Sequence, residues 1–392
     1  MNSYNKETHK KDIDYKNEES FFNQNSKEKP LNIQLRSKLS FSDNRIKINK
    51  KRYHITIRNV HELPNNRIGI LTEFYLLIHS LNTFKLISKL EPDLKLIISG
   101  DKKIGFCPLF DFIVLKNNDL VIWNSRVIFL YSLKTQEYNL YQIINEYSQG
   151  TDKDKEKYFD YCCGKFIYVK SIYELSNDKL VSCNSYELKI YYKKKNEYYL
   201  ESKIKTNDVE KVVEIKPNIL ILFQKQFVGR KCLGGIGRNV FMNSISIYDI
   251  KNETELILNI YDFLVEGEGD INFLIKNNYL LTRYGNNIDI FNIDKNMKLI
   301  KNENEKDYYS CNYNIFGEKT IKTEMKIKFL CDYYGDLFFV KNLNGVKIYK
   351  FENEKITFFS DFPFEIKSFK GMQKLKNNLL VMYSDNEIKV LQ

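Results

Sequence analysis

One segment combines glycines with cationic residues in a pattern that could bind an anion. Residues 224–243 read QKQFVGRKCLGGIGRNVFMN and hold four of the 16 glycines and two of the nine arginines of the chain. Glycine backbone amides beside Arg230, Lys231 and Arg238 are the groups from which phosphate-binding concavities are built. The motifs GxxxxGK[ST] and GxGxxG and a two-arginine FRRG phosphoinositide motif are absent, however. Anion binding by this segment is therefore one alternative among three.

The same segment also reads as a long hairpin that turns at residues 234–235. Its apolar residues would then be anchors for a protein partner, because a few buried aromatic and aliphatic side chains dominate most interfaces. A hairpin that only protrudes is the third reading. The residues that we single out for binding are Phe227, Arg230, Lys231, Leu233, Arg238 and Phe241, with Val228 and Val240 as further apolar positions.

The four histidines, at positions 9, 54, 61 and 79, stand in no pattern typical of catalysis. The motifs HExxH of zinc peptidases and GxSxG of serine hydrolases are absent, and so is a cysteine–histidine nucleophile signature. We expect a packed imidazole at His79, because the repeated segments described below carry an aromatic residue at that position. The sequence therefore predicts a protein that is not an enzyme.

Neither the cysteines nor the clustered acids indicate a metal or cofactor site. No CxxC pair occurs, and we expect reduced, mostly buried thiols. The adjacent Cys162 and Cys163 lie in a polar stretch, where redox sensing is an alternative. Glu266, Glu268 and Asp270 lack the twelve-residue EF-hand pattern, so a solvated turn is favoured. The cysteines stand at positions 107, 162, 163, 183, 232, 311 and 331.

The formal net charge of +11 favours an acidic partner only weakly. The chain has no alanine and 52 lysines against nine arginines, as a strongly AT-biased gene would encode. Residues 1–52 carry 13 Lys/Arg and 7 Asp/Glu, so the charge is concentrated near the N-terminus. Arginine, which binds bases and phosphates through its planar fork, is scarce. RNA binding is therefore an alternative and not the main prediction.

The hydropathy of the chain indicates neither a membrane span nor a secretory leader. No apolar run approaches the roughly 18 residues of a transmembrane helix. The first residues lack the apolar core of a signal peptide. We expect an intracellular, cytoplasmic protein, and the nucleus stays open as a second compartment.

A repeat runs through the chain. Seven short segments share the order apolar, polar, apolar, aromatic, polar, apolar, and their aromatic positions are spaced by 52 residues on average. Self-similarity at such a period is typical of repeat folds. The positions of this aromatic column are His79, Tyr131, Tyr191, Tyr248, Phe291, Tyr349 and Leu391.

Each repeat reads as four strands joined by short turns. Before the aromatic segment come two apolar stretches around Asn, Asp or Gly, for example at 113–123 and 372–383. Asn and Asp tolerate the left-handed backbone that tight hairpins need. After it comes one more alternating stretch, such as 356–362. Seven four-stranded units predict an all-β, seven-bladed β-propeller, because separate β-sandwiches would need about 100 residues each.

The repeats resemble those of the WD40 family over residues 45–392. Residues 244–250 (SISIYDI) are similar to the family's T-I-K-I-W-D-L strand, and residues 375–390 follow its last strands. The resemblance implies a protein-interaction propeller. No repeat has the Gly-His dipeptide, however, and only one has Asp after the aromatic residue. The hydrogen-bond network that WD40 proteins build from His, Ser/Thr, Asp and Trp is therefore expected to be missing.

The last repeat lacks a fourth strand, because the chain stops at Gln392 in its third. In WD40-like rings an N-terminal segment supplies that strand. We expect it within residues 41–52, where Ile46 and Ile48 alternate with charged residues. This gives a disordered, basic polar tail over 1–40 and a single propeller domain over 41–392.

Four insertions interrupt the repeat, at 92–109, 145–165, 224–243 and 301–325. On a WD40-like template all four are expected to open onto one face of the ring, and inserted loops commonly carry binding sites. The prediction is a non-catalytic scaffold that binds a protein partner through this loop-rich face. The alternative is a reader of an anionic ligand, a phosphoinositide or RNA, through 224–243 and the basic tail.

Overall fold

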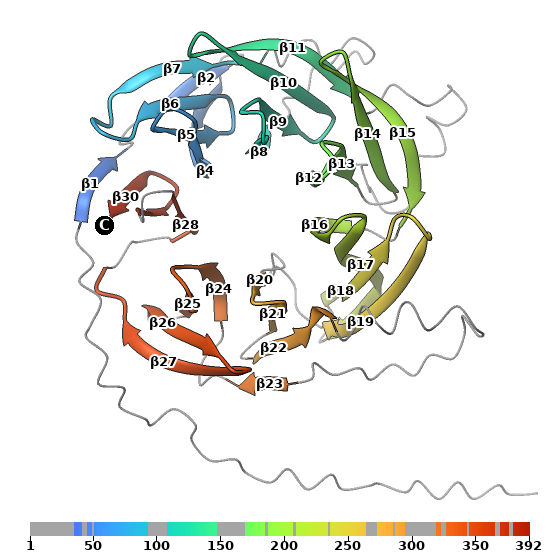
Figure 1. The fold of residues 1–392 in the computed structure, drawn as a ribbon. Coiled ribbons are helices and arrows are strands. Elements are labelled where there is room, and N and C mark those ends of the chain that lie inside the picture. Colours follow the sequence, from blue (N-terminus) through green and yellow to red (C-terminus); the bar gives the residue numbers. More distant parts are fainter. Residues whose placement is uncertain are drawn as a thin grey trace, which may run out of the picture.

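The computed structural model describes residues 35–40, 45–48, 51–92, 108–146, 169–184, 187–206, 209–233, 236–263, 273–284, 287–294, 319–322, 327–342, 345–364, 369–375 and 379–392. In these ranges the chain forms seven antiparallel sheets of four strands each, and one separate two-stranded hairpin. Figure 1 shows the seven sheets as blades around a central axis, with the first strand of each blade nearest the centre. The predicted all-β, seven-bladed propeller is confirmed.

The first three blades follow one another along the chain. Blade 1 has strands β4 (Ile57–Leu63), β5 (Arg67–Thr72), β6 (Leu76–Ser80) and β7 (Leu86–Leu90). Blade 2 has β8 (Leu109–Val114), β9 (Leu120–Asn124), β10 (Val127–Lys134) and β11 (Glu137–Asn145). Blade 3 has β12 (Ser171–Glu174), β13 (Leu180–Cys183), β14 (Glu187–Lys194) and β15 (Glu197–Lys205).

The next three blades repeat this order, and the last borrows a strand. Blade 4 has β16 (Val209–Lys216), β17 (Ile219–Leu233), β18 (Ile236–Asp249) and β19 (Thr254–Phe263). Blade 5 has β20 (Phe273–Lys276), β21 (Tyr279–Tyr284), β22 (Asn287–Asn292) and β23 (Lys319–Lys322). Blade 6 has β24 (Ile327–Asp332), β25 (Leu337–Asn342), β26 (Gly345–Glu352) and β27 (Lys355–Asp361). Blade 7 has β28 (Gly371–Lys374), β29 (Leu380–Tyr383), β30 (Glu387–Leu391) and β1 (Leu35–Ser40).

Tight turns with left-handed backbone join many of these strands. Asn277 and Asn278, which connect β20 to β21, have φ angles of 47° and 66°. Lys195 and Asn196 connect β14 to β15 in the same way, at 50° and 74°. Two successive positive φ values match the twist of the flanking strands. The asparagine-rich stretches that predicted hairpins therefore lie at turns that need this backbone.

The aromatic column lies in the third strand of every blade, as the repeat predicted. All seven residues are buried. His79 packs in place of an aromatic residue, and its Nδ1 lies 2.9 Å from the carbonyl oxygen of Phe84. The members are His79, Tyr131, Tyr191, Tyr248, Phe291, Tyr349 and Leu391.

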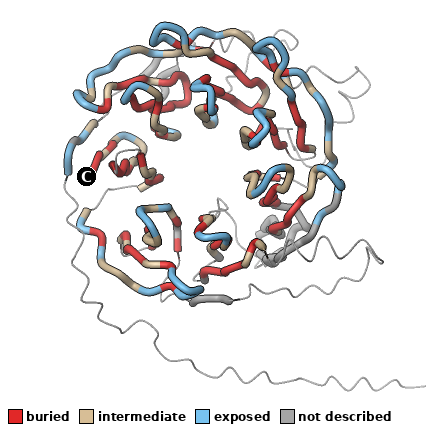
Figure 2. The backbone as a smooth tube through the Cα atoms, viewed as in Figure 1, coloured by how far each residue is buried: buried red, intermediate tan, exposed pale blue. Residues whose placement is uncertain are grey.

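The hydrophobic core lies between neighbouring blades, and Figure 2 shows buried residues within the blades and exposed ones at the rim. Between blades 1 and 2, Leu63 and Ile78 pack with Phe112 and Phe129. A Cβ added to Gly69 would stand 2.9 Å from the ring of Phe112, so this glycine permits the close approach of blade 2. A blade therefore buries its faces only against its neighbours, which favours a closed ring.

The strand that completes blade 7 differs in position from the predicted one. β1 pairs with β30, with Leu39 opposite Ile388 and Ser40 opposite Glu387. The prediction that the closing strand lies within 41–52 was therefore wrong. The expected boundary of the tail at residue 40 was wrong as well, because residues 35–40 form that strand. In the segment 41–52, β2 (Arg45–Ile48) pairs instead with β3 (Lys51–His54) in a local hairpin. Alternation identifies a strand but not its partner, and a local hairpin closes at a small cost in chain entropy.

Candidate functional site

The two faces of the ring differ in the connections that they carry. At one face the backbone N–H of Leu109, at the start of β8, donates to the carbonyl oxygen of Glu73, between β5 and β6 (2.8 Å). Across blades 7 and 1, the backbone N–H of Ile57 donates to the carbonyl oxygen of Asp385 (2.8 Å). We call this side the connection face. It carries the links between blades and those between the second and third strands of a blade.

Three of the four insertions belong to the connection face. Residues 92–109 and 145–165 follow the outer strands β7 and β11, although most of both insertions lies outside the described residues. Residues 224–243 join the second and third strands of blade 4. The fourth insertion, 301–325, was assigned to the wrong link. Its residues 301–318 lie outside the described part of the chain, but the strands that flank them, β22 and β23, are the third and fourth of blade 5, and strands in that order are linked at the opposite face.

That error has a structural reason. The long polar stretch before residue 319 resembles a link between blades, and β23, with four residues, is too short to stand out in sequence. The hairpin formed by β2 and β3 lies between the end of β1 and the start of β4. It therefore belongs to the connection face. The sequence had predicted the closing strand of the last blade in this segment.

The β17–β18 hairpin is longer than its blade. The two strands pair continuously from Ile219 and Asp249 to Leu233 and Ile236. The ladder with β16 ends at Gln224, and the ladder with β19 ends at Phe241. We call residues 225–243 the arm. The predicted turn at 234–235 lies outside the described residues, between the paired Leu233 and Ile236.

All six sequence-predicted binding residues lie on the arm. Phe227 is the register partner of Phe241 at its base, and Lys231 is the partner of Arg238 nearer the tip. Arg230 is the partner of Asn239, and Leu233 is the last paired residue of β17. Their side chains are outside the described part of the structure. Gly229 and Gly237 lie in the paired strands, which leaves 234–235 for the loop amides of an anion nest.

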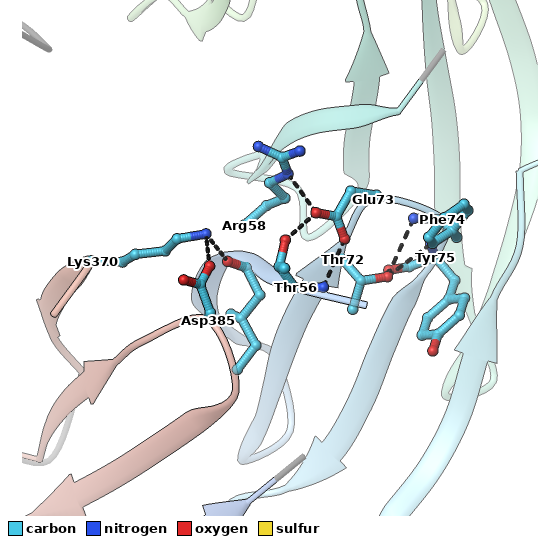
Figure 3. A network of polar contacts seen from close by, with 9 residues as sticks. Thr56, Arg58, Thr72, Glu73, Phe74, Tyr75, Lys370 and Asp385 are labelled. Atoms are coloured by element: carbon cyan, nitrogen blue, oxygen red, sulfur yellow. Dashed lines mark hydrogen bonds and ion pairs between the residues drawn. The ribbon is translucent and has the colours of Figure 1, made fainter. Parts of the chain in front are cut away.

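A network of polar contacts closes the ring on the connection face (Figure 3). The backbone N–H of Thr56 donates to Oε2 of Glu73 (2.8 Å), and Nε of Arg58 lies 3.2 Å from Oε1 of the same carboxylate. Across the blade boundary, Lys370 pairs with Asp385 and donates to the carbonyl oxygen of Ile57 (3.1 Å). These cations are neutralised by acids in place. We therefore assign the network to ring closure and not to ligand binding.

Sequence reasoning missed a second polar cluster, which joins the inner strands of blades 7, 1 and 2 to Tyr383 of β29. Tyr383 donates its hydroxyl hydrogen to Oδ1 of Asn59 (3.1 Å), and Nδ2 of Asn59 donates to Asp111. The same Nδ2 lies 3.0 Å from Nε2 of His61, and the amide of Gln373 lies 2.7 Å from Nδ1 of His61. Three blades are thus joined through one histidine. The sequence signal was a polar residue at matching inner-strand positions.

The surroundings of His61 favour its neutral form. Burial lowers its pKa, Asp111 opposes that shift, and Lys211 adds to it. With the Gln373 amide turned so that Oε1 accepts the Nδ1–H, Nε2 is left to accept from Asn59. That orientation also satisfies Oε1, which otherwise is buried without a partner. The polar groups of the cluster are hydrogen-bonded to one another, which is typical of side chains that hold neighbouring blades together.

A buried ion pair joins β14 of blade 3 to the residue that follows β11 of blade 2. Lys189 pairs with Glu146, and their side chains are only 4% and 5% exposed. The hydroxyls of Ser182 (2.6 Å) and Tyr191 (2.8 Å) both donate to Oε1 of Glu146. Burial, and next to it the charge of Glu146, raises the pKa of Tyr191 and keeps its hydroxyl a donor. A lysine between the apolar residues Leu188 and Ile190 was the available signal.

The described residues offer no obvious metal chemistry. Within them, no group of three or more His, Cys, Asp or Glu side chains could hold a metal ion. Cys183 and Cys331 are free thiols. The pair Cys162 and Cys163 and the acids at 266–270 lie outside the described residues. No helix among the described residues is long and apolar enough to cross a membrane.

The comparisons with known proteins identify the fold. No family model and no curated protein matches the chain. Among solved structures, a chain of the mitotic checkpoint complex has a TM-score of 0.50 at 10% identity, covering 90% of this chain and 96% of its own. A streptogramin B lyase has a TM-score of 0.49 at 10% identity (92% and 97%), and Sqt1 of Saccharomyces cerevisiae 0.48 at 9% (86% and 95%). The chain is a seven-bladed β-propeller with four-stranded blades.

Proposed function

We propose that this protein is a non-catalytic interaction platform that binds a protein partner on its connection face, with the arm as the principal contact. The observation that carries the proposal is the arm itself, a paired hairpin that continues beyond both neighbouring strands of blade 4. We expect a cytoplasmic protein.

The energetics of a hairpin favour a binding role for the arm. Ordering backbone costs about 1–2 kcal/mol per residue, and an isolated two-stranded hairpin is marginal in water. Residues 225–233 and 236–240 have no third strand in the described ladders that would offset this cost. A partner that covers the arm would supply the missing contacts. Its apolar positions, Phe227 and Phe241 at the base and Leu233 at the tip, are the anchors that we expect.

The alternative is an anionic ligand, and the charge of the arm favours it. Residues 225–243 carry four cationic residues and no acid. Binding to a nucleic acid weakens steeply with salt, whereas an apolar protein contact responds little. A salt series on any captured partner therefore separates the two.

Shortening the arm is expected to remove the partner without destabilising the ring. Replacing residues 228–240 by Asn-Gly joins Phe227 to Phe241, which already are register partners, through a two-residue turn. The pairing of β18 with β19 is retained up to Phe241. The tagged variant and the parent chain are used to capture proteins from the native cells, and the two sets are compared by quantitative mass spectrometry. At least about a tenfold loss of a stoichiometric partner is expected.

Two controls make that comparison decisive. The melting temperature of the shortened variant should match that of the parent, because the ladders of β16 with β17 up to Gln224 and of β18 with β19 up to Phe241 are both kept. Tyr334→Ser removes a side chain that is 63% exposed on the opposite face, between β24 and β25. It should retain the partner. A shortened chain that is folded and keeps every partner would eliminate the arm as the binding site.

A further inference from the structure

In the described ladders, the arm extends beyond both strands that flank it. Beyond Gln224 no described residue pairs with β17 on its outer side, and beyond Phe241 none pairs with β18. An open edge is a row of backbone N–H and C=O groups, and such a row is a template for another strand. An extended peptide that adds to an edge gains main-chain hydrogen bonds, and its side chains provide specificity.

The arm is also uniformly cationic. Its charged residues are Lys225, Arg230, Lys231 and Arg238, and it has no Asp or Glu. Lys231 and Arg238 are register partners. Like charges at directly opposite positions weaken a ladder, so this pairing costs hairpin stability until a negative group offsets it.

A second cationic hairpin lies on the same face. β2 and β3 span residues 45–54, which include five cationic residues and no acid. Lys47 and Arg52 are register partners there, which repeats the like-charge pairing of the arm. Both hairpins belong to the connection face, so the face carries nine cations that no acid of either hairpin balances.

Codon bias explains surplus lysine but not the placement of arginine. Four of the nine arginines lie on these two hairpins. Three others are used within the ring: Arg58 pairs with Glu73 (3.2 Å), Arg67 donates to the carbonyl oxygen of Gln136 (2.6 Å), and Arg283 donates to that of Ile327 (2.6 Å). Arginine is the cation that binds carboxylates through a planar fork, so its concentration in these two segments favours an acidic partner.

We infer that the partner contributes an extended, acidic peptide segment that adds as a β-strand to an open edge of the arm. This rests on the proposed function and gives the chemistry of the partner. A peptide supplies backbone partners for the edge and carboxylates for the cations, whereas a bilayer or a nucleic acid supplies only negative charge. The β2–β3 hairpin adds long-range attraction for the same segment.

The test uses a labelled peptide that alternates Glu and Val, and the full chain, with binding followed by fluorescence anisotropy. A second peptide of the same sequence carries methyl groups on successive backbone nitrogens, which blocks both of its edges, so it keeps its charge but cannot pair as a strand. The unmodified peptide is expected to bind, and the methylated one at least about tenfold more weakly. Equal binding of the two peptides would overturn strand addition.

Charge reversal of the arm provides the matched variant. Arg230→Glu, Lys231→Glu and Arg238→Glu together should weaken peptide binding at least about tenfold. The control makes the same change in net charge at exposed lysines near turns of the opposite face, and it should bind as the parent does. Its substitutions are Lys134→Glu, Lys195→Glu and Lys355→Glu. Equal loss in both variants would reduce the effect to net charge and overturn the inference.

The outcomes also separate this inference from the proposed function. If arm shortening removes the cellular partner but no acidic peptide binds, the strand-addition inference fails and the platform stands. If phosphatidylserine vesicles or single-stranded RNA bind more tightly than the peptide and displace it, the inference fails in favour of that ligand. If the shortened chain keeps every partner, the proposed function fails, whatever the peptide does.

Discussion

Removal of residues 1–40 is expected to unfold the ring, whereas removal of residues 1–34 is expected to leave its thermal stability nearly unchanged. The difference between the two chains is β1, which forms the fourth strand of blade 7. Five of its residues are in register with β30, and Nζ of Lys38 lies 3.1 Å from Oε1 of Glu387. Without β1, the edge of β30 is open to solvent and the ring is no longer closed by its own chain.

The size of this effect follows from the ladder. At about 1 kcal/mol net for each backbone hydrogen bond, loss of the pairing costs about 5 kcal/mol. The total free energy of unfolding of a native protein is only about 5–15 kcal/mol. Thermal unfolding followed by circular dichroism compares the two truncations with the full chain. Equal melting temperatures for the chains that start at 35 and at 41 would show that β1 does not close the ring.

Breaking the buried ion pair of blade 3 is expected to have the second largest effect on stability. Glu146→Ala leaves the ammonium of Lys189 in a site where its side chain is 4% exposed, and it removes the acceptor of Ser182 and Tyr191. Loss of one member of a buried pair costs about 3–5 kcal/mol. Lys189→Ala should cost a similar amount, because Glu146 is then buried without its cation.

The double variant distinguishes the charge from the packing. Glu146→Leu with Lys189→Met removes both charges and keeps the volume, so it should be clearly more stable than either single variant. Urea unfolding measures the free energy of all three. If the single variants had free energies of unfolding within about 1 kcal/mol of the parent's, the pair would not be buried in solution.

The blades themselves were predictable, because each repeat records local geometry. The column from His79 to Leu391 marks the third strand of each blade, and its residue is buried in every blade. Asparagine pairs such as 277–278 mark the turns, because only a few residue types accept two positive φ angles. Periodicity of this kind depends on neighbours in sequence and is therefore visible in the sequence.

The contacts between distant segments were not predictable from one sequence. Leu39 pairs with Ile388 across nearly the whole chain, while Ile46 pairs with Tyr53 nearby, and both segments alternate in the same way. The contact of His61 with Gln373 likewise depends on which blades become neighbours when the ring closes. The hairpin at 224–243 was found because glycines and arginines are rare in this chain.

Photo-crosslinking from the arm tests the binding role of the connection face most directly. A photo-reactive phenylalanine derivative is incorporated in place of Phe241 in one chain and in place of Tyr334 in another, and both are irradiated in the native cells. Phe241 lies at the base of the arm, and Tyr334 lies on the opposite face with 63% exposure. The platform proposal predicts a discrete crosslinked protein from the Phe241 position and none from Tyr334. The same protein crosslinked only from Tyr334 would contradict it and place the partner on the other face.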